Sequence, residues 1–357
     1  MDLHIVGGFL GSGKTTAIIG AAKHLMAQGT RVGVVTNDQG KYLVDTAFFA
    51  AEAVPAVEVT GGCFCCNYDD LDAQLSQLRE TAKPDVIFAE SVGSCADIVA
   101  TVVKPLLELR GPKLGAPSSF SVFADARLLR RRLLDLPMPF SDEVIYLFDK
   151  QIEEAGLLVV NKRDLLSPPE EQEVKRLAQM RFPGKPVRLQ NSLDGDEVAG
   201  WARTLASGLA APPTASLDID YGRYGAGEVR LAWLDEKLTF VLAEGEGRAV
   251  VRRFVDALLA RLQHRGAAIG HLKFMVESGE VAAKVSIPTL ETDSWWEQIP
   301  ELPGTQVTVL VNARVELEAA DVHALVHEAA EVAEAMYEVS DVAFFHPSYP
   351  TPTYRIA

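Results

Sequence analysis

Residues 7 to 16 have the sequence GGFLGSGKTT in a chain of 357 residues. Four of these residues fit the phosphate-loop pattern G-x-x-x-x-G-K-[ST], namely Gly8, Gly13, Lys14 and Thr15. The apolar run LHIV precedes the loop and predicts a strand, and the run that ends at Gly29 predicts a helix. This strand–loop–helix context predicts a site for the phosphates of a nucleotide.

Each part of the loop has a chemical role in that prediction. Glycines allow backbone N–H groups to curl around phosphate oxygens, and the N-terminus of the following helix adds partial positive charge. Lys14 is expected to reach the β- and γ-phosphates, and the Thr15 hydroxyl is expected to bind Mg²⁺. The predicted phosphate-binding residues are Gly8, Gly11, Ser12, Gly13, Lys14, Thr15 and Thr16.

Composition narrows the class of protein. The formal net charge is −15, which argues against a broad surface for nucleic acid or anionic membranes. No apolar run approaches the roughly 20 residues that span a bilayer, and the first strand starts at once, with no expected signal peptide. We therefore expect a cytoplasmic protein that binds neither nucleic acid nor membrane.

Strand and helix patterns alternate over the first 200 or so residues and then change. The first part predicts an α/β fold, a P-loop NTPase with a mainly parallel sheet, over residues 1–210. A linker is expected over residues 211–227, which contain Ala-Pro-Pro-Thr. Residues 228–357 predict a smaller α+β domain with an antiparallel sheet, in which 321–337 form a helix and the proline-rich tail is extended.

The sequence NKRD follows a predicted strand about 145 residues after the phosphate loop. The carboxylate of Asp164 can accept hydrogen bonds from N1–H and the exocyclic amine of guanine, and the amide of Asn161 can meet the O6/N7 edge. Adenine would leave such groups without partners, which is costly. With Lys162 between them, these residues predict a guanine site.

Carboxylates at strand ends are the candidates for catalysis. Glu90 ends a buried strand and can hold Mg²⁺, directly or through water, and Gly93 can donate its N–H to the γ-phosphate. Asp38 and Asp45 are the alternatives for orienting the attacking water. Lys14 completes the predicted catalytic set.

The chain has four cysteines, and three of them lie in the sequence GGCFCC. Cys63, Cys65 and Cys66 can occupy three corners of a tetrahedron around Zn²⁺ or another thiophilic ion. We expect Cys95, five residues after Glu90, either to complete the site in one nucleotide state or to pack at the start of a helix. The thiols converge if the strands before Cys63 and Cys95 are neighbours.

The order GGFLGSGKTT, TNDQG, GGCFCC, ExxG and NKRD resembles that of CobW-like GTPases, which belong with the UreG, HypB and MeaB types. The resemblance covers roughly residues 1–200. It implies a GTPase that uses GTP, GDP and Mg²⁺, assembles as a nucleotide-dependent homodimer, and delivers Zn²⁺ or another transition metal to a client protein. It assigns Lys14 and Thr15 to nucleotide and Mg²⁺, the C-x-C-C thiols to metal, and Asn161 and Asp164 to guanine.

Two alternatives remain open from the sequence. One is a GTPase chaperone for a cobalamin-dependent enzyme, and the other is a zinc-stabilised nucleotide sensor. The histidine-rich stretch of many relatives is absent, and the scattered histidines are expected to be ordinary surface or core residues, among them His323 and His327.

Overall fold

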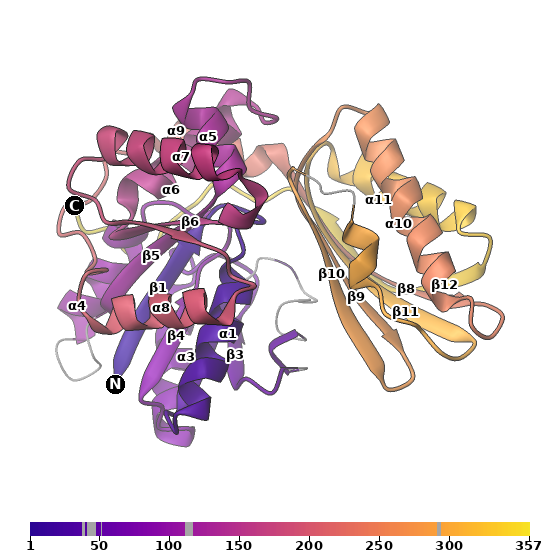
Figure 1. Cartoon of the computed structure of the whole chain (residues 1–357), viewed down its shortest axis with the longest axis horizontal. Helices are drawn as coiled ribbons and strands as arrows, with labels where there is room; N and C mark the ends of the chain where they lie inside the picture. Colours follow the sequence, from indigo (N-terminus) through magenta and orange to yellow (C-terminus); the bar gives the residue numbers. More distant parts are fainter. Residues whose placement is uncertain (38–39, 41–47, 51, 111–116, 291–293) are drawn as a thin grey trace. The chain divides into compact units, whose positions relative to one another are not determined.

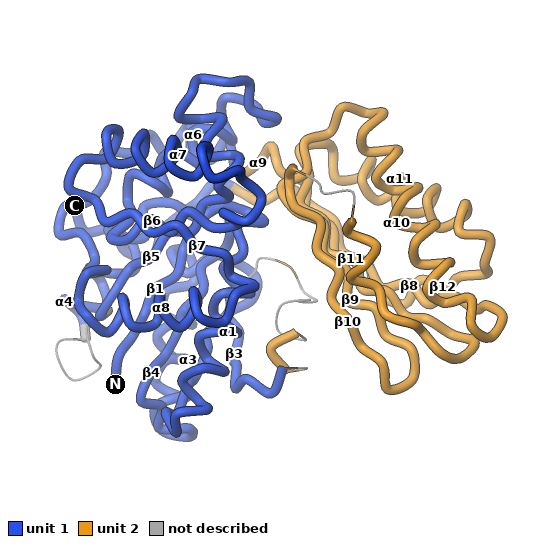
Figure 2. The backbone as a smooth tube through the Cα atoms, in the orientation of Figure 1, with its two compact units in different colours: residues 1–39, 52–227, 349–357 blue, residues 40–51, 228–348 orange. Residues whose placement is uncertain are grey.

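The computed structural model describes residues 1–37, 40, 48–50, 52–110, 117–290 and 294–357. The chain divides into two compact units (Figure 2). Unit 1 contains residues 1–39, 52–227 and 349–357, and unit 2 contains residues 40–51 and 228–348. Residues 211–227, expected as a linker, and the C-terminal tail 349–357 therefore both belong to unit 1.

Unit 1 is built on a seven-stranded sheet in the order β3-β2-β4-β1-β5-β6-β7, in which every neighbouring pair is parallel. The strands are β1 (Asp2–Gly8), β2 (Val32–Asn37), β3 (Ala56–Val59), β4 (Val86–Glu90), β5 (Pro117–Asp125), β6 (Leu157–Asn161) and β7 (Val187–Gln190). Parallel neighbours need crossover connections, which place helices over the sheet (Figure 1). The predicted P-loop NTPase fold is confirmed.

The helices of this part of the chain are α1 (Lys14–Ala27), α3 (Tyr68–Thr81), the π-helix η1 (Val99–Val103), α4 (Lys104–Arg110), α5 (Ala126–Leu133), α6 (Asp142–Glu154), the 3-10 helix η3 (Arg163–Leu165), α7 (Pro168–Arg181), α8 (Gly195–Ala206) and α9 (Tyr221–Arg230). On α8, the buried Trp201 packs edge-on against Phe123 and donates from Nε1 to the Ser121 hydroxyl at 3.2 Å. This anchors α8 on the sheet, because burying an aromatic ring contributes about 2–3 kcal/mol.

Unit 2 is built on an antiparallel sheet in the order β10-β9-β11-β8-β12, with helices α10 and α11 beside it (Figure 1). Its elements are β8 (Leu231–Val241), α10 (Gly247–His264), β9 (Ala268–Ser278), β10 (Val281–Pro288), the 3-10 helix η4 (Trp295–Gln298), β11 (Gln306–Glu316), α11 (Ala319–Val332) and β12 (Met336–Phe345). The inward faces of the sheet and of both helices share one apolar core. The predicted α+β domain with an antiparallel sheet is confirmed.

The helix predicted over 321–337 was wrong at its C-terminal end. Helix α11 stops at Val332, and Glu334 has a φ of 56°, which breaks helical geometry. Residues 336–345 then form β12, an edge strand paired only with β8 within the described sheet. Among the described helices, none combines the length and the apolar character needed to cross a membrane.

Candidate functional site: phosphate loop and thiol cluster

The loop between β1 and α1 has a backbone that only glycine can follow at several points. Gly8, Gly11 and Gly13 have φ values of 128°, 68° and 90°. A Cβ atom on Gly8 would lie 2.2 Å from the carbonyl oxygen of Phe123 on β5. Gly13 caps the N-terminus of α1, so the N–H groups of the first helical turn face the loop. The arrangement is a cradle for phosphate oxygens.

Two charged side chains flank this cradle. The Lys14 ammonium donates to the carbonyl oxygens of Gly8 and Phe9 at 2.8 and 3.3 Å, which holds it across the loop. The Thr15 hydroxyl donates to Glu90 Oε1 at 2.9 Å, and both side chains are buried. Glu90 ends β4, and its register partner Val6 lies on β1 next to the loop. The Thr15 hydroxyl and the Glu90 carboxylate are adjacent oxygen donors, the ligand type that Mg²⁺ takes in proteins.

The segment after Glu90 packs directly on the phosphate loop. A Cβ atom on Gly93 would lie 3.0 Å from the Cα and N atoms of Leu10, so only glycine allows this approach. The Gly93 carbonyl accepts a hydrogen bond from Gln151 Nε2 at 3.0 Å. The phosphate loop and the 91–95 segment are therefore in close contact at Leu10 and Gly93.

The NKRD residues divide into one that fastens loops together and one that is exposed. Asn161 Nδ2 donates to the Ser12 carbonyl at 2.7 Å, and Asn161 Oδ1 accepts from the backbone N–H and the hydroxyl of Ser192 at 3.0 and 2.8 Å. Asn161 thus ties the phosphate loop to the loop after β7. The side chain of Asp164 is exposed, on the short helix η3.

Lys162 has a left-handed backbone with a φ of 62°, and its ammonium lies 3.1 Å from Asp125 Oδ2. Burial lowers the pKa of Lys162, partly offset by Asp125. Burial alone would raise the pKa of Asp125, but the charges of Lys162 and Arg127 lower it overall. Sequence reasoning missed Asp125. It ends β5 and caps α5 by accepting from the Arg127 N–H, so its place at a strand end was the available signal.

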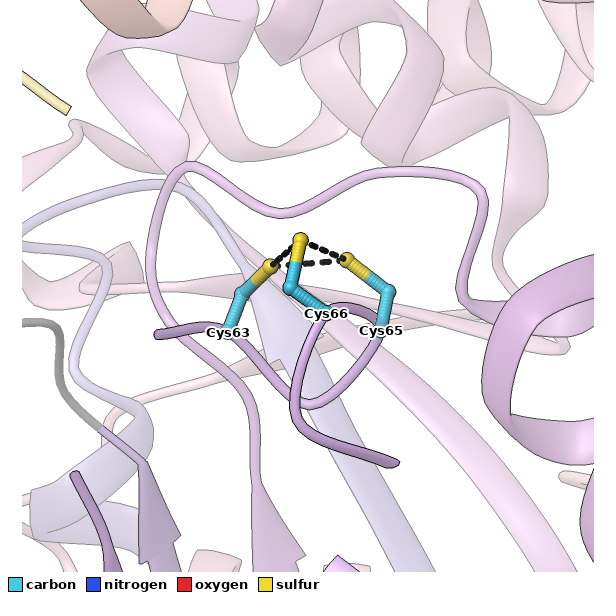
Figure 3. A group of neighbouring side chains, drawn as sticks. All are labelled: Cys63, Cys65 and Cys66. Atoms are coloured by element: carbon cyan, nitrogen blue, oxygen red, sulfur yellow. Dashed lines mark hydrogen bonds between the residues drawn. The ribbon is translucent and has the colours of Figure 1, made fainter. Parts of the chain in front are cut away.

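The cysteine loop between β3 and α3 is held by Asn37 at the end of β2. Asn37 Nδ2 donates to the carbonyls of Val59 and Gly62 at 3.1 and 2.7 Å, and Asn37 Oδ1 accepts from the Phe64 N–H at 2.8 Å. The backbone N–H groups of Cys66 and Asn67 both donate to the Cys63 carbonyl. The loop closes into a tight turn that directs three side chains to one point, as Figure 3 shows.

The three thiols of this turn are in mutual contact. Sγ–Sγ distances are 2.7 Å for Cys63–Cys65, 3.2 Å for Cys63–Cys66 and 3.8 Å for Cys65–Cys66. Sulfurs around a tetrahedral Zn²⁺ with bonds of about 2.3 Å lie about 3.8 Å apart, so a bound ion would require the first two pairs to open by up to about 1 Å. Cys63 and Cys65 are buried and Cys66 is half-buried.

The cluster stabilises one thiolate. Hydrogen bonds from Cys65, Cys66 and Cys95 hold the pKa of the Cys63 thiol well below its usual range. The same contact with Cys63 raises the pKa of Cys65 well above its usual range and raises the pKa of Cys66 to about 11. A thiolate surrounded by thiol donors is a ready ligand for a soft cation.

Cys95 joins this cluster by a route that differs from the one expected. Strands β3 and β4 are not neighbours, because β2 lies between them. The Cys95 thiol is nevertheless buried near this cluster, where it helps to lower the pKa of Cys63 and to raise the pKa of Cys65. The segment after Glu90 brings it there. Asp38 and Asp45, the candidates for orienting water, lie outside the described residues.

The C-terminal tail supplies contacts that the sequence did not predict. The Thr351 N–H donates to Cys66 Sγ at 3.3 Å, and the Thr353 N–H and hydroxyl donate to the carbonyls of Cys65 and Cys66 at 2.9 and 2.8 Å. Arg355 Nε donates to the fully buried Asp97 at 2.8 Å, two residues beyond Cys95. The tail therefore contacts both segments that carry the thiols. No spacing rule connects residues 285 positions apart in sequence.

Comparison with known proteins agrees with this geometry. A family model described as CobW/HypB/UreG, nucleotide-binding domain, matches residues 2–187. The zinc chaperone YeiR of Escherichia coli (strain K12) is 31% identical over 183 residues, or 48% of this chain and 50% of that protein. The zinc chaperone CobW of Sinorhizobium sp is 27% identical over 209 residues, or 52% of this chain and 57% of that protein. The chain spans about half the length of these curated relatives.

Among solved structures, HypB from Helicobacter pylori in complex with nickel is 18% identical, with a TM-score of 0.44. The match covers 61% of this chain and 92% of that one. The family model alone matches more than half of the 357 residues, including the phosphate loop, the thiol cluster and the NKRD sequence. The chain belongs to the CobW/HypB/UreG family.

Proposed function

We propose that this protein binds GTP, hydrolyses it to GDP and phosphate, and uses the reaction to hold and hand over a thiophilic metal ion, most simply Zn²⁺, to a client metalloprotein. The nucleotide and the metal ion are its substrate and its cargo. Mg²⁺ held by Thr15 and Glu90 would neutralise charge on the phosphates. The sequence pattern identifies no arginine finger, so we expect GTP hydrolysis without a partner to be slow, about 10⁻⁴ to 10⁻² s⁻¹.

One chain of contacts carries this proposal. The Thr15 hydroxyl in the phosphate loop bonds to Glu90, and the segment that follows Glu90 packs on Leu10 and ends at Cys95. The Cys95 thiol lies near the thiols of Cys63 and Cys65, since it helps to shift their pKa values. Glu90, the proposed Mg²⁺ ligand, and Cys95, a candidate metal ligand, thus lie five residues apart on one segment.

Guanine recognition is assigned to the NKRD loop in the same proposal. Asp164 is exposed and available to a base, whereas Asn161 holds the base loop against the phosphate loop. Residues that fix the distance between these loops favour binding, because they fix the separation of base and phosphate sites. The proposal also includes two partners: a second copy of this chain, in a homodimer that depends on bound nucleotide, and the client metalloprotein.

Nucleotide-driven release of zinc tests the proposal. Protein loaded with one equivalent of Zn²⁺ under reducing conditions is mixed with a chromophoric chelator, and zinc transfer is followed with GDP, with GTP and with a non-hydrolysable GTP analogue. We expect the rate of transfer to differ between the GTP and GDP forms in the wild-type protein. Lys14→Ala should retain zinc but lose the response to nucleotide.

Identical transfer rates in all three nucleotide conditions would contradict the proposal and favour a zinc-stabilised nucleotide sensor. The proposal would also be contradicted if added cobalamin stimulated GTP hydrolysis while neither cobalamin nor nucleotide changed the rate of zinc transfer. That second outcome would favour a chaperone of a cobalamin-dependent enzyme. Circular dichroism of Lys14→Ala checks that the variant is folded.

A further inference from the structure

A second group of possible metal ligands lies in residues 228–348 of unit 2, which the family model does not cover. Glu236 is on β8, and His323 and His327 are one helical turn apart on α11. Strand β8 lies between β11 and the edge strand β12, and α11 packs on both β8 and β12 (Figure 1). The helix therefore places two imidazoles over one carboxylate.

The three side chains converge closely. His323 Nδ1 lies 3.1 Å from Glu236 Oε2, and His327 Nε2 lies 2.8 Å from Glu236 Oε1. The two imidazole rings have centroids 4.5 Å apart and planes at 77°. One ligand atom from each residue lies within 4.8 Å of the other two. Donors around a four-coordinate ion with bonds of about 2.0–2.2 Å lie roughly 3.3–3.6 Å apart, so small adjustments suffice.

Both imidazoles are oriented by neighbouring aromatic side chains. The hydroxyl of Tyr337 lies 3.2 Å from His327 Nδ1, a contact that leaves Nε2 directed at the carboxylate. The ring of His323 stacks on Phe344 at a centroid distance of 4.6 Å and an angle of 14°. A hydrogen bond to the far nitrogen and a packed ring plane are the usual means of fixing a histidine ligand.

A simple hydrogen-bonded Glu–His pair accounts for this arrangement only in part. Glu236 Oε1 and His327 Nε2 are 2.8 Å apart, yet within the part of the chain that the structure describes neither atom makes a hydrogen bond of acceptable geometry. The Glu236 side chain is fully buried. A bound cation would offset the free-energy cost of burying the carboxylate, because a buried charge is costly unless it is paired.

We propose that Glu236, His323 and His327 bind a divalent transition-metal ion of the borderline class, such as Zn²⁺ or Co²⁺. Nitrogen and oxygen donors distinguish this site from the thiol cluster of unit 1 and favour Zn²⁺, Co²⁺ or Ni²⁺ over Cu⁺. The histidine side chains are about one-third exposed, at 28% and 32%, which gives an ion access from solvent and leaves room for water as a further ligand. The inference does not depend on the function proposed for unit 1.

Co²⁺ binding to the full-length protein tests the proposal. Thiolate ligation gives strong ligand-to-metal charge-transfer absorption, whereas a Glu–His₂ site gives only weak d–d bands. We expect wild-type protein to bind one more equivalent of Co²⁺ than the double variant His323→Ala/His327→Ala, with the lost equivalent carrying no thiolate absorption. His264→Ala, an exposed histidine at the end of α10, is the matched control and should match the wild type.

Glu236→Gln keeps the size of the side chain and removes its charge. We expect it to weaken the binding of Co²⁺ and Zn²⁺ at this site at least tenfold, since losing a ligand should cost no less than losing a residue that only orients a ligand. It should also abolish a zinc-induced rise in the unfolding temperature of unit 2, measured in protein that is folded without metal. Equal metal stoichiometry and equal thermal shifts in wild-type, Glu236→Gln and double-histidine proteins would overturn the proposal.

Discussion

Asn161 ends β6 and Asp164 lies three residues later on η3, yet their environments differ sharply. The amide of Asn161 is buried and engaged with Ser12 and Ser192, while the carboxylate of Asp164 is exposed. Sequence reasoning assigned both to the base. The assignment of Asp164 rests on the NKxD pattern, whereas the contacts of Asn161 depend on a phosphate loop almost 150 positions earlier. Spacing alone does not determine such contacts.

Replacing Asp164 should change nucleotide choice. An amide at this position can no longer accept two hydrogen bonds from guanine, but it can donate to the extra carbonyl of xanthine. Asp164→Asn is expected to weaken GTP binding by about 2–4 kcal/mol, or roughly 30- to 1000-fold, and to favour xanthosine triphosphate. Competition binding with a fluorescent GDP analogue measures this, with Asp196→Asn, an exposed aspartate on α8, as the control. ATP competing as well as GTP against wild-type protein would contradict the guanine assignment.

The buried Glu154 should make the free energy of unfolding depend on pH. Burial raises its pKa from 4.5 to about 8, and its Oε1 accepts from the Val99 N–H at 2.5 Å. Because the folded state holds the proton more tightly, the contribution of Glu154 to stability is greatest below pH 4.5 and is lost as pH rises from there through about 8. The loss at pH 7 is on the order of 3 kcal/mol.

Glu154→Gln removes the titrating group and keeps an oxygen acceptor for Val99. Its unfolding free energy, measured with urea between pH 5 and 8, should therefore fall less with rising pH than that of the wild type. Glu153→Gln, a neighbouring residue on α6 that is more exposed, is the control and should retain the wild-type slope. Parallel slopes for the wild type and Glu154→Gln would show that Glu154 is ionised in the folded protein.

At the scale of elements, the strand–loop–helix pattern around residues 7–16 was sufficient to predict β1 and α1. The alternation of strand and helix patterns over the first 200 or so residues predicted the parallel sheet. The order of the strands was not available from it. Strand β2 separates β3 from β4, so the cysteine loop is held by Asn37 of β2 rather than by a neighbouring β4. Helix α11 was predicted too long, because the alternating pattern of 336–345 is weak and its strand lies at a sheet edge.

The tail, residues 349–357, gives a prediction at this scale. It donates a hydrogen bond to Cys66 Sγ and packs Tyr354 edge-on against Tyr68 at the start of α3. Deleting residues 350–357 should increase the rate at which a thiol reagent modifies Cys66, roughly tenfold, because it removes that donor and the covering backbone. Stopped-flow modification measures the rate. An unchanged rate in the folded, truncated protein would show that the tail does not protect the cluster.

At the scale of the whole molecule, the sequence predicted an α/β domain followed by an α+β domain, because the spacing of apolar residues changes near residue 228. It did not predict that residues 349–357 belong to unit 1, since a proline-rich tail has no periodic pattern to assign. It also treated His323 and His327 as ordinary residues. Their i, i+4 spacing on one helix was a usable signal, but Glu236 lies 87 positions away from His323, and only the fold brings it close.

The central claim is that nucleotide and metal act on one another through the segment from Glu90 to Cys95. The most direct test is a titration of Zn²⁺ against the GDP form and against the form with a non-hydrolysable GTP analogue, using a competing chelator. We predict that the Zn²⁺ affinities of the two nucleotide forms differ about 5- to 150-fold. Zinc should change the relative affinities for the two nucleotides by the same factor. In Cys95→Ser the difference in Zn²⁺ affinity should be smaller. Equal zinc affinities in the two nucleotide forms would contradict the account.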